Sequence, residues 1–262
     1  MGDYLGDCIE TSILRLKTAG QMVDAGRWQG VPTEGKPDLV TKEILNLSFA
    51  GFIPLDMEDL IDEVNPNMPW AETEFQERVS GHPFNPHTSL TQWPWWHGQE
   101  GQTMTHGMFS HTYSERFWPK HAGLNVEPDD CYVTKGDPLQ GIRYPYGDLE
   151  DVVILLQQEP FTRQATFPIF FPEDTGAVHG GRIPCTLHYH FLRRGNNLHL
   201  WYAIRSCDAV RHFRDDVYMA ARLLLWMIER LTDDGPWEHV VPGDLYFTAY
   251  SFHVHMGDYH LL

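Results

Sequence analysis

The hydrophobic and polar positions alternate most clearly between residues 186 and 208. Every second residue from Leu187 to Phe191 is apolar, and the two residues between them are histidines. Gly195-Asn196-Asn197 interrupts this pattern, and apolar side chains then return at every second position from Leu198 to Ile204. Two alternating runs separated by a glycine-asparagine turn predict a β-hairpin.

Other segments show the spacing of helices, with apolar residues three and four positions apart. We expect helices at residues 7–25, 69–80, 148–158 and 217–231, and a short apolar strand at 44–52. The last of these helices is apolar on most sides, which predicts that it is buried in the core. The chain therefore combines helices and strands.

A cysteine and an arginine lie at the two ends of the predicted hairpin. Cys185 follows a proline and precedes the first strand, and Arg205 begins an Arg-Ser-x-Asp sequence at the end of the second strand. Because an antiparallel hairpin returns to its starting edge, the thiol and the guanidinium can meet there. A cationic neighbour lowers the pKa of a thiol from about 8.5 and makes it a better nucleophile. This end of the hairpin is a candidate active site.

The composition limits the kind of protein this can be. With 262 residues, of which 42% are hydrophobic, the chain can bury a large core, and we expect a single domain over residues 1–262. The formal net charge of −17 argues against a nucleic acid polymer or an anionic membrane as partner, because both favour basic surfaces. Four cysteines without C-x-x-C spacing, no long apolar run and no secretory leader predict a reduced, cytoplasmic protein.

The combination of Pro-Cys, a strand pair and Arg-Ser-x-Asp resembles the thymidylate synthase superfamily, in which these motifs occur with this spacing. The resemblance is strong from about residue 148 onward and loose before it. It implies an α/β (α+β) fold of three layers, with a large mixed β-sheet flanked by helices. Eleven residues after Arg205, that family carries the side chain that reads the pyrimidine. Asp216 stands there and resembles the deoxycytidylate (dCMP) hydroxymethylase branch, whereas thymidylate synthases have asparagine.

The resemblance also implies the residues that carry the chemistry. Cys185 would add to C6 of the pyrimidine, which makes C5 a nucleophile toward 5,10-methylenetetrahydrofolate, the co-substrate. Glu74, seven residues before Gly81, matches a glutamate that moves protons through water. Glu72 and Glu77 lie in the same segment, and a surface carboxylate is the usual alternative for such residues. Tyr113 stands near the position of an active-site tyrosine, although a serine follows it instead of the family's glycine.

Arginines would hold the phosphate of the nucleotide. Arg205 and Ser206 would contact it within one subunit. Arg163 lies in Glu-Pro-Phe-Thr-Arg-Gln, which is similar to the acid-Pro-x-Ser-Arg-Arg of relatives, whose arginines cross the interface of a homodimer. Gln164 replaces the second arginine, which weakens this clamp in principle. The expected partners are a pyrimidine nucleoside monophosphate, the folate and a second copy of the chain.

Further residues match positions that contact the sugar or the folate. His253 keeps the spacing of the family's His-x-Tyr and His255 replaces its tyrosine, so both would hydrogen-bond the 3′-hydroxyl. Asp208 matches a residue that contacts the pterin and lies near the base. Trp95 and Trp96, in an aromatic loop, would pack on the folate and the reacting carbon, and simple packing is the alternative for both.

Two products are compatible with this chemistry. Methylating relatives transfer a hydride from the folate, which requires that water is excluded, whereas hydroxymethylating relatives add water. Only Met256–Leu262 follow His255, too few residues for the C-terminal lid of methylating relatives. We therefore expect that dCMP becomes 5-hydroxymethyl-dCMP, a modified nucleotide for viral DNA made in the host cytoplasm. The alternative is a C5 methyltransferase that acts on dCMP or dUMP.

The 15 histidines favour a different class of protein. The pairs His188-x-His190 and His253-x-His255 would each place two imidazoles on one face of a strand, as in metal-dependent β-barrel oxygenases with a two-histidine, one-carboxylate site. The apolar helix after Asp216 does not suit an all-β barrel, and metal binding gives no reason for the Pro-Cys motif, so we expect no metal site. A catalytically silent nucleotide-binding homologue is a third alternative, which the retained Cys185 disfavours.

Overall fold

The computed structural model describes residues 3–28, 31–96, 104–105, 107–120, 122, 147–177, 182–232 and 235–262. The chain divides into two compact units. The first contains Met1–Pro66 and Phe191–Leu262, and the second contains Asn67–His190. The expectation of one domain over residues 1–262 stays a prediction.

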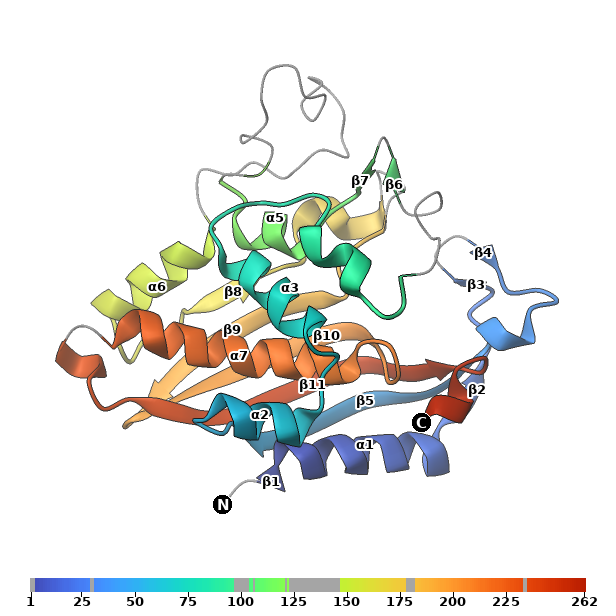
Figure 1. Cartoon of the computed structure of the whole chain (residues 1–262), viewed down its shortest axis with the longest axis horizontal. Coiled ribbons are helices and arrows are strands. Elements are labelled where there is room, and N and C mark those ends of the chain that lie inside the picture. The colour runs from blue at the N-terminus through green and yellow to red at the C-terminus, as the bar shows by residue number, and fades with distance from the viewer. Residues whose placement is uncertain are drawn as a thin grey trace. The chain divides into compact units, whose positions relative to one another are not determined.

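Seven strands of the described residues form one mixed sheet, in the order β1-β5-β11-β10-β9-β8, with β2 paired to β5 (Figure 1). Strand β10 runs parallel to β11, and β11 runs antiparallel to β5. The mixed α/β class with a large mixed sheet is therefore confirmed. The strands of this sheet are β1 Asp3–Tyr4, β2 Gln21–Val23, β5 Thr41–Phe52, β8 Thr166–Pro168, β9 Thr186–Arg194, β10 Asn197–Asp208 and β11 Val241–His255. Two smaller sheets pair β3 Arg27–Trp28 with β4 Val31–Pro32, and β6 Met104–Thr105 with β7 Met108–Phe109.

Three α-helices of the first unit, α1 Leu5–Ala19, α2 Met57–Val64 and α7 Phe213–Leu231, pack on its strands and on one another. Helix α1 contacts β5, α7 contacts β10 and β11, and α2 contacts both α1 and α7. The core beneath α7 is aromatic, because the Phe213 ring lies 4.7 Å from the Phe252 ring and 5.4 Å from the Phe247 ring. The buried helix predicted after Asp216 is confirmed.

The helix predicted at residues 7–25 ends before Gly20, so this prediction is wrong for its last turns. The chain turns at Gly20, and Gln21–Val23 form β2, which pairs with residues 41–43 of β5. A side chain at Gly20 would lie 2.5 Å from the Leu16 carbonyl oxygen, so only glycine fits this turn. Sheet pairing, rather than helical spacing, decides the conformation of the residues that follow.

The predicted hairpin is present as β9 and β10, which are neighbours in the sheet. Its turn is Gly195-Asn196, where Gly195 has a φ of 58°, a left-handed conformation that glycine adopts without steric cost. Every second residue from Tyr189 to Arg193 is buried, as the alternation predicted. Strand β10 is longer than predicted and continues to Asp208, because its last residues pair with residues 251–253 of β11.

The second unit contains helices α3 Trp70–Val79, α5 Tyr113–Phe117 and α6 Leu149–Gln158, together with strand β8 and the short helices η2 Thr88–Gln92 and η4 Pro172–Ala177. Helices α3 and α6 agree within one residue with the predicted helices at 69–80 and 148–158. In the core of this unit, the Phe117 ring packs edge-on against Phe167 at 5.1 Å and against Tyr189 at 6.1 Å. A buried ion pair joins Arg116 to Asp174 at 2.8 Å.

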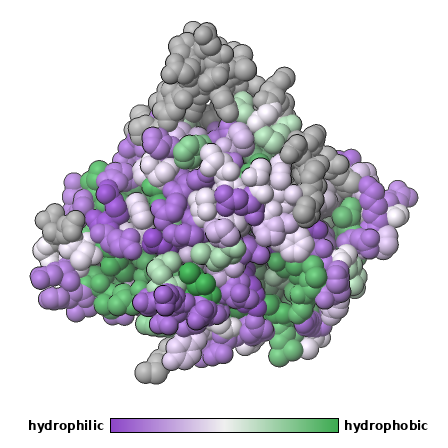
Figure 2. Space-filling view, viewed as in Figure 1, coloured by the Kyte–Doolittle hydropathy of each residue, from purple (hydrophilic) through white to green (hydrophobic). Residues whose placement is uncertain are grey.

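Hydrophilic and hydrophobic residues are interspersed on the face drawn in Figure 2. In the first unit, four large apolar side chains on β5 and β11 are exposed: Leu45 at 70%, Phe52 at 40%, Val241 at 41% and Tyr250 at 51%. None of the helices in the described part of the chain combines the length and the apolarity that crossing a membrane requires.

Candidate active site

The predicted site residues fall in both compact units. The second unit contains Cys185, Glu74, Tyr113, Arg163, Trp95 and Trp96, and the first contains Arg205, Ser206, Asp208, Asp216, His253 and His255. Each unit brings several of these side chains close to one another.

The predicted nucleophile, Cys185, lies directly before β9, as the sequence predicted. Its side chain is half-buried and takes part in no disulfide within the described part of the chain. The next residue, Thr186, is fully buried. Its backbone N–H and its hydroxyl both donate to the Tyr113 hydroxyl oxygen, at 3.4 Å and 3.2 Å. Tyr113 therefore contacts the residue that follows the nucleophile.

Helix α5 begins at Tyr113 and is fixed there by a capping box. The Thr112 hydroxyl accepts from the Glu115 N–H at 3.2 Å, and the Glu115 carboxylate accepts from the Thr112 N–H at 2.9 Å. Glu115 is buried and also accepts from the Asn85 amide at 3.1 Å. Burial raises the pKa of Glu115 to about 7, although the hydrogen bonds from Asn85 and Thr112 partly oppose this shift. No motif in the sequence indicated this carboxyl group, whose pKa lies near neutral pH.

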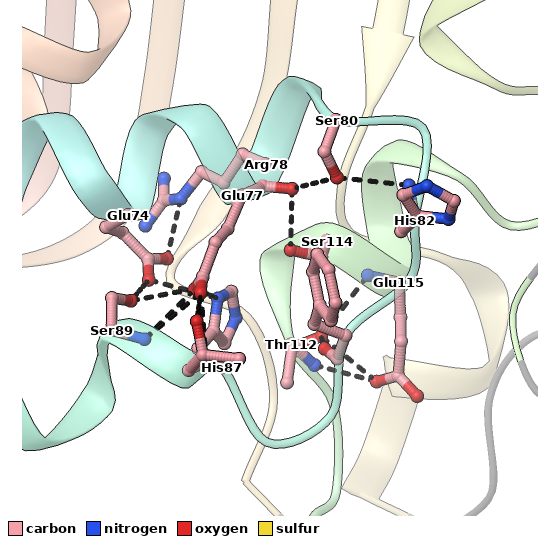
Figure 3. Close-up of polar contacts among 12 residues, drawn as sticks. Glu74, Glu77, Arg78, Ser80, His82, His87, Ser89, Thr112, Ser114 and Glu115 are labelled. Carbon is pink, nitrogen blue, oxygen red and sulfur yellow. Dashed lines mark hydrogen bonds and ion pairs between the residues drawn. The ribbon is translucent and has the colours of Figure 1, made fainter.

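Glu74 is buried in α3 and surrounded by hydrogen-bond donors (Figure 3). The Arg78 guanidinium lies 2.9 Å from its carboxylate, the His87 Nδ1 lies 3.0 Å away, and the Ser89 hydroxyl donates at 2.9 Å. Burial alone would raise the pKa of Glu74. The charges and hydrogen bonds of His87 and Arg78 outweigh burial and hold this pKa far below its ordinary value. Glu74 is therefore a fixed carboxylate at neutral pH.

Glu77 and His87 complete this cluster, and no motif in the sequence selected either of them as a site residue. Glu77 is buried, so the alternative of a surface carboxylate does not hold for this residue. Its carboxylate accepts from the backbone N–H groups of Thr88 and Ser89, at 3.0 Å and 3.1 Å, and so attaches the start of η2 to α3. Burial opposes protonation of His87, but the charge of Glu74 and the hydrogen bonds to Glu74 and Glu77 raise the pKa of His87 to about 9. His87 is thus an imidazolium at neutral pH.

Arg78 links this cluster to Tyr113. Its guanidinium carbon lies 4.1 Å from the centre of the Tyr113 ring, which is cation–π geometry. The same guanidinium is paired with Glu74. A continuous series of contacts therefore runs from Glu74 through Arg78 and Tyr113 to Thr186, the neighbour of Cys185. A spacing of four residues in α3 places Glu74 and Arg78 on one helix face, and this was the signal available in the sequence.

The two tryptophans of the aromatic loop are half-buried. The Trp96 ring packs edge-on against Phe109 at 6.1 Å. Nearby in the sequence, Trp93 packs against Trp70 of α3 at 6.0 Å. These contacts fit the alternative of simple packing, and the contact of Trp95 and Trp96 with a folate stays a prediction.

Arg163 and Gln164 are both exposed on the turn that follows α6. The turn is closed by a hydrogen bond from the Thr162 N–H to the Glu159 carbonyl, at 2.9 Å. The Gln164 N–H donates to the Thr162 hydroxyl at 3.2 Å. The turn therefore presents the Arg163 side chain to solvent.

In the first unit, the Arg-Ser-x-Asp sequence forms the last four residues of β10. Ser206 and Asp208 pair with Ser251 and His253 of the parallel strand β11. Because both strands end at the same edge of the sheet, the predicted phosphate, folate and sugar residues of this unit share one edge. The carboxyl ends of parallel strands are common positions for ligand sites.

Asp216, the predicted reader of the base, lies in the first turn of α7. The helix begins at Phe213, earlier than predicted, and the Asp216 N–H donates to the His212 carbonyl at 2.7 Å. The helix dipole favours a carboxylate at the N-terminal end of a helix, where Asp216 lies. The thiol of Cys207 lies 3.8 Å from the Asp216 carboxylate. Cys207 is buried, and it contacts the residue that would read the base.

Two groups of described side chains have the spacing that a metal ion needs. They are Asp208 with His253 and His255, and Glu74 with Glu77 and His87. In the first group, burial lowers the pKa of His253. The described strands form an open sheet in the order from β1 to β8, whereas the oxygenase alternative has a closed β-barrel.

Comparison with known proteins gives no family for this chain. No protein-family model matches it, and no curated protein matches it.

Proposed function

We propose that this chain is a folate-dependent C5 hydroxymethylase that converts dCMP to 5-hydroxymethyl-dCMP in the cytoplasm, with a three-layer fold of thymidylate synthase type. The observation that best supports this proposal is the series of contacts from Glu74 through Arg78 and Tyr113 to Thr186. It connects the proposed proton-transfer group to the residue after the proposed nucleophile.

In this mechanism the Cys185 thiolate adds to C6 of cytosine, and the electron pair of the C5–C6 double bond makes C5 nucleophilic. 5,10-Methylenetetrahydrofolate supplies the one-carbon unit that becomes bonded to C5. Glu74, held as a carboxylate by Arg78 and His87, orients the water that removes the C5 proton. The bond between the one-carbon unit and the folate then breaks, so loss of the C5 proton and of tetrahydrofolate leaves an exocyclic methylene. Water adds to this methylene, and Cys185 leaves C6 to regenerate the double bond. The folate is not oxidised, which distinguishes this route from methylation.

Asp216 selects cytosine over uracil. Cytosine has an amino donor at C4 and an acceptor at N3, whereas uracil has an acceptor at C4 and a donor at N3. A carboxyl group matches cytosine when it accepts from the amine and shares a proton with N3. The position of Asp216 in the first turn of α7 fixes where its carboxyl group lies.

The phosphate and the sugar bind to the remaining residues. Arg205 and Ser206 bind the 5′-phosphate with Arg163 of the partner subunit, by charge-assisted hydrogen bonds. The exposure of Arg163 supports a role outside its own subunit. The exposed apolar side chains on β5 and β11 support a homodimer, because burying them against a second copy is favourable. His253 and His255 hydrogen-bond the 3′-hydroxyl.

One set of incubations tests this proposal. The purified protein is mixed with dCMP, dUMP or CMP and 5,10-methylenetetrahydrofolate, and the nucleotide mass is measured alongside the absorbance of dihydrofolate. We expect the mass gain of a hydroxymethyl group on dCMP without formation of dihydrofolate. A methyl-sized gain with dihydrofolate would make the protein a C5 methyltransferase, and unchanged nucleotides would overturn the proposal.

A further inference from the structure

Three potential metal ligands meet at the ends of β10 and β11. Asp208 is the last residue of β10 and pairs with His253, and His255 lies two residues further along β11. One ligand atom from each of the three side chains lies within 4.8 Å of the other two. The two imidazole rings are 5.4 Å apart at an angle of 84°. Two nitrogens and one carboxylate oxygen are thus close enough to converge on one ion after small side-chain rotations.

The hydrogen bonds of both histidines fix the tautomer that a metal requires. The Nδ1 of His255 lies 3.3 Å from the Leu39 carbonyl oxygen, which can only accept, so Nδ1 carries the proton. The Nδ1 of His253 lies 3.4 Å from the Ser251 hydroxyl oxygen. That hydroxyl donates its proton to Glu43, so it accepts from His253. In both rings the lone pair is therefore on Nε2. A histidine that binds a metal commonly donates its other N–H to a carbonyl or to a chain ending in a carboxylate.

The carboxylate of Asp208 is also held in place. Its Oδ1 accepts from the backbone N–H groups of Val210 and Arg211, at 2.9 Å and 3.0 Å. The Arg211 guanidinium pairs with Asp258 at 2.7 Å and lies 4.0 Å from Oδ2 of Asp208. The nearest cation is thus engaged mainly by another carboxylate, and Asp208 is oriented by its backbone contacts.

The second group of potential ligands, Glu74 with Glu77 and His87, lacks these properties. Its positive charge is already supplied by Arg78, 2.9 Å from Glu74. The Nδ1 of His87 already forms ion pairs with both carboxylates, at 3.0 Å and 3.3 Å. A metal ion there would have to displace a proton and compete with a guanidinium.

We propose that Asp208, His253 and His255 form a binding site for one divalent transition-metal ion of the zinc, iron and cobalt type. Two imidazoles and one carboxylate suit these ions, whereas magnesium and calcium prefer oxygen ligands. Two observations support this proposal: the combination of nitrogen and oxygen ligands, and the hydrogen bonds that occupy Nδ1 of both histidines. The proposal does not depend on the function proposed above.

The metal site predicts competition with the nucleotide, and this consequence rests on the proposed function. His253 and His255 are the side chains that bind the sugar hydroxyl in that proposal. One ion on their Nε2 atoms removes the lone pairs that would accept the hydroxyl proton. Zinc should therefore weaken dCMP binding, and dCMP should weaken zinc binding to the same extent.

The test titrates the full-length protein, stripped with a chelator, with Co²⁺ and Zn²⁺. Calorimetry should give one ion per chain, and Co²⁺ should produce visible ligand-field absorption that Zn²⁺ abolishes. His255→Gln and Asp208→Asn should each weaken binding by at least about tenfold, the lower limit for losing even an outer hydrogen-bond partner of a metal ligand. Ser251→Ala keeps all three ligands and should weaken binding by about tenfold or more for the same reason.

His199→Gln is the matched control. His199 lies on β10 with its Nδ1 3.5 Å from the Asp244 carboxylate of β11, so the same two residue types meet on the same two strands, and the described residues supply no third ligand there. This variant should bind the metal like the wild type, and circular dichroism verifies that all variants are folded. Absence of stoichiometric binding, or binding unchanged in both His255→Gln and Asp208→Asn, would overturn the metal site. Metal binding that dCMP does not weaken would leave the metal site intact and count against the proposed sugar site.

Discussion

The guanidinium group of Arg78 lies over the ring of Tyr113, with the guanidinium carbon 4.1 Å from the centre of the ring. Because the same guanidinium pairs with Glu74 in the buried interior of the second unit, Arg78 has two functions. It compensates the charge of Glu74, and it packs on the tyrosine that contacts Thr186.

Replacing Arg78 should therefore be costly. Arg78→Met leaves the Glu74 carboxylate buried with one cation fewer, and we expect a loss of about 3–5 kcal/mol in the free energy of unfolding. Urea denaturation measures this loss. The matched control is Gln76→Ala on the same helix, which removes an exposed hydrogen bond to Glu72 and should change stability by no more than about 0.5 kcal/mol. Equal effects of the two substitutions would contradict the role given to Arg78.

Substitution of the proposed nucleophile separates chemistry from folding. Cys185→Ser should abolish turnover of dCMP, because a serine hydroxyl has no thiolate character at neutral pH. Nucleotide binding and the melting temperature should change little, since the side chain is only half-buried. Cys207→Ser is the control, because a hydroxyl can still donate to Asp216, and its effect should be mild. Mass spectrometry of the product measures both variants, and substantial turnover by Cys185→Ser would exclude the covalent mechanism.

Asp216 should decide which base reacts. Asp216→Asn exchanges a carboxyl group that matches cytosine for an amide that matches uracil. A mismatched buried hydrogen-bond pair costs about 1–3 kcal/mol, which corresponds to a change of roughly 5- to 150-fold in the ratio of kcat/KM for dCMP to that for dUMP. Steady-state kinetics with both nucleotides measures this ratio. Equal wild-type rates on dCMP and dUMP would refute the assignment.

The pKa of His87 predicts how stability depends on pH. It is raised from 6.5 to about 9, so the folded state binds this proton more tightly than the unfolded state. The resulting stabilisation is complete below pH 6.5 and is lost as the pH rises through about 9. The free energy of unfolding should therefore fall between pH 7.5 and pH 10. This pH range lies above the pKa of Glu115, which is about 7. His87→Gln should lose most of this dependence, and an unchanged slope would show that His87 is not the responsible group.

Local patterns predicted the hairpin and most of the helices. The alternation around Gly195 and the spacing in α3, α6 and α7 are properties of short segments, so they can be recognised without the rest of the chain. The segment Gln21–Val23 shows the limit of this approach, because its strand conformation depends on pairing with β5, about twenty residues further along the chain.

The candidate site likewise contains some residues that local motifs predict and others whose position depends on distant parts of the chain. Glu74, Tyr113 and Cys185 could be selected from motifs, and the contacts around them connect Glu74 to the neighbour of Cys185. Glu77 and His87 could not, because their burial results from the return of residues 87–89 to α3 after a loop with no period of its own. Such a contact between distant residues makes a histidine an imidazolium at neutral pH without leaving any local pattern in the sequence.

The position of β11 in the sheet has a consequence for synthesis of the protein. Val241–His255 pairs with β5 on one side and with β10 on the other, but it leaves the ribosome after both of them. Until then, β5 and β10 lack the partner that joins them, and their edges can pair with other chains. Among the described strands of this sheet, β11 is thus the last to be made, so the first unit can complete its core only after residues 241–255 have been translated.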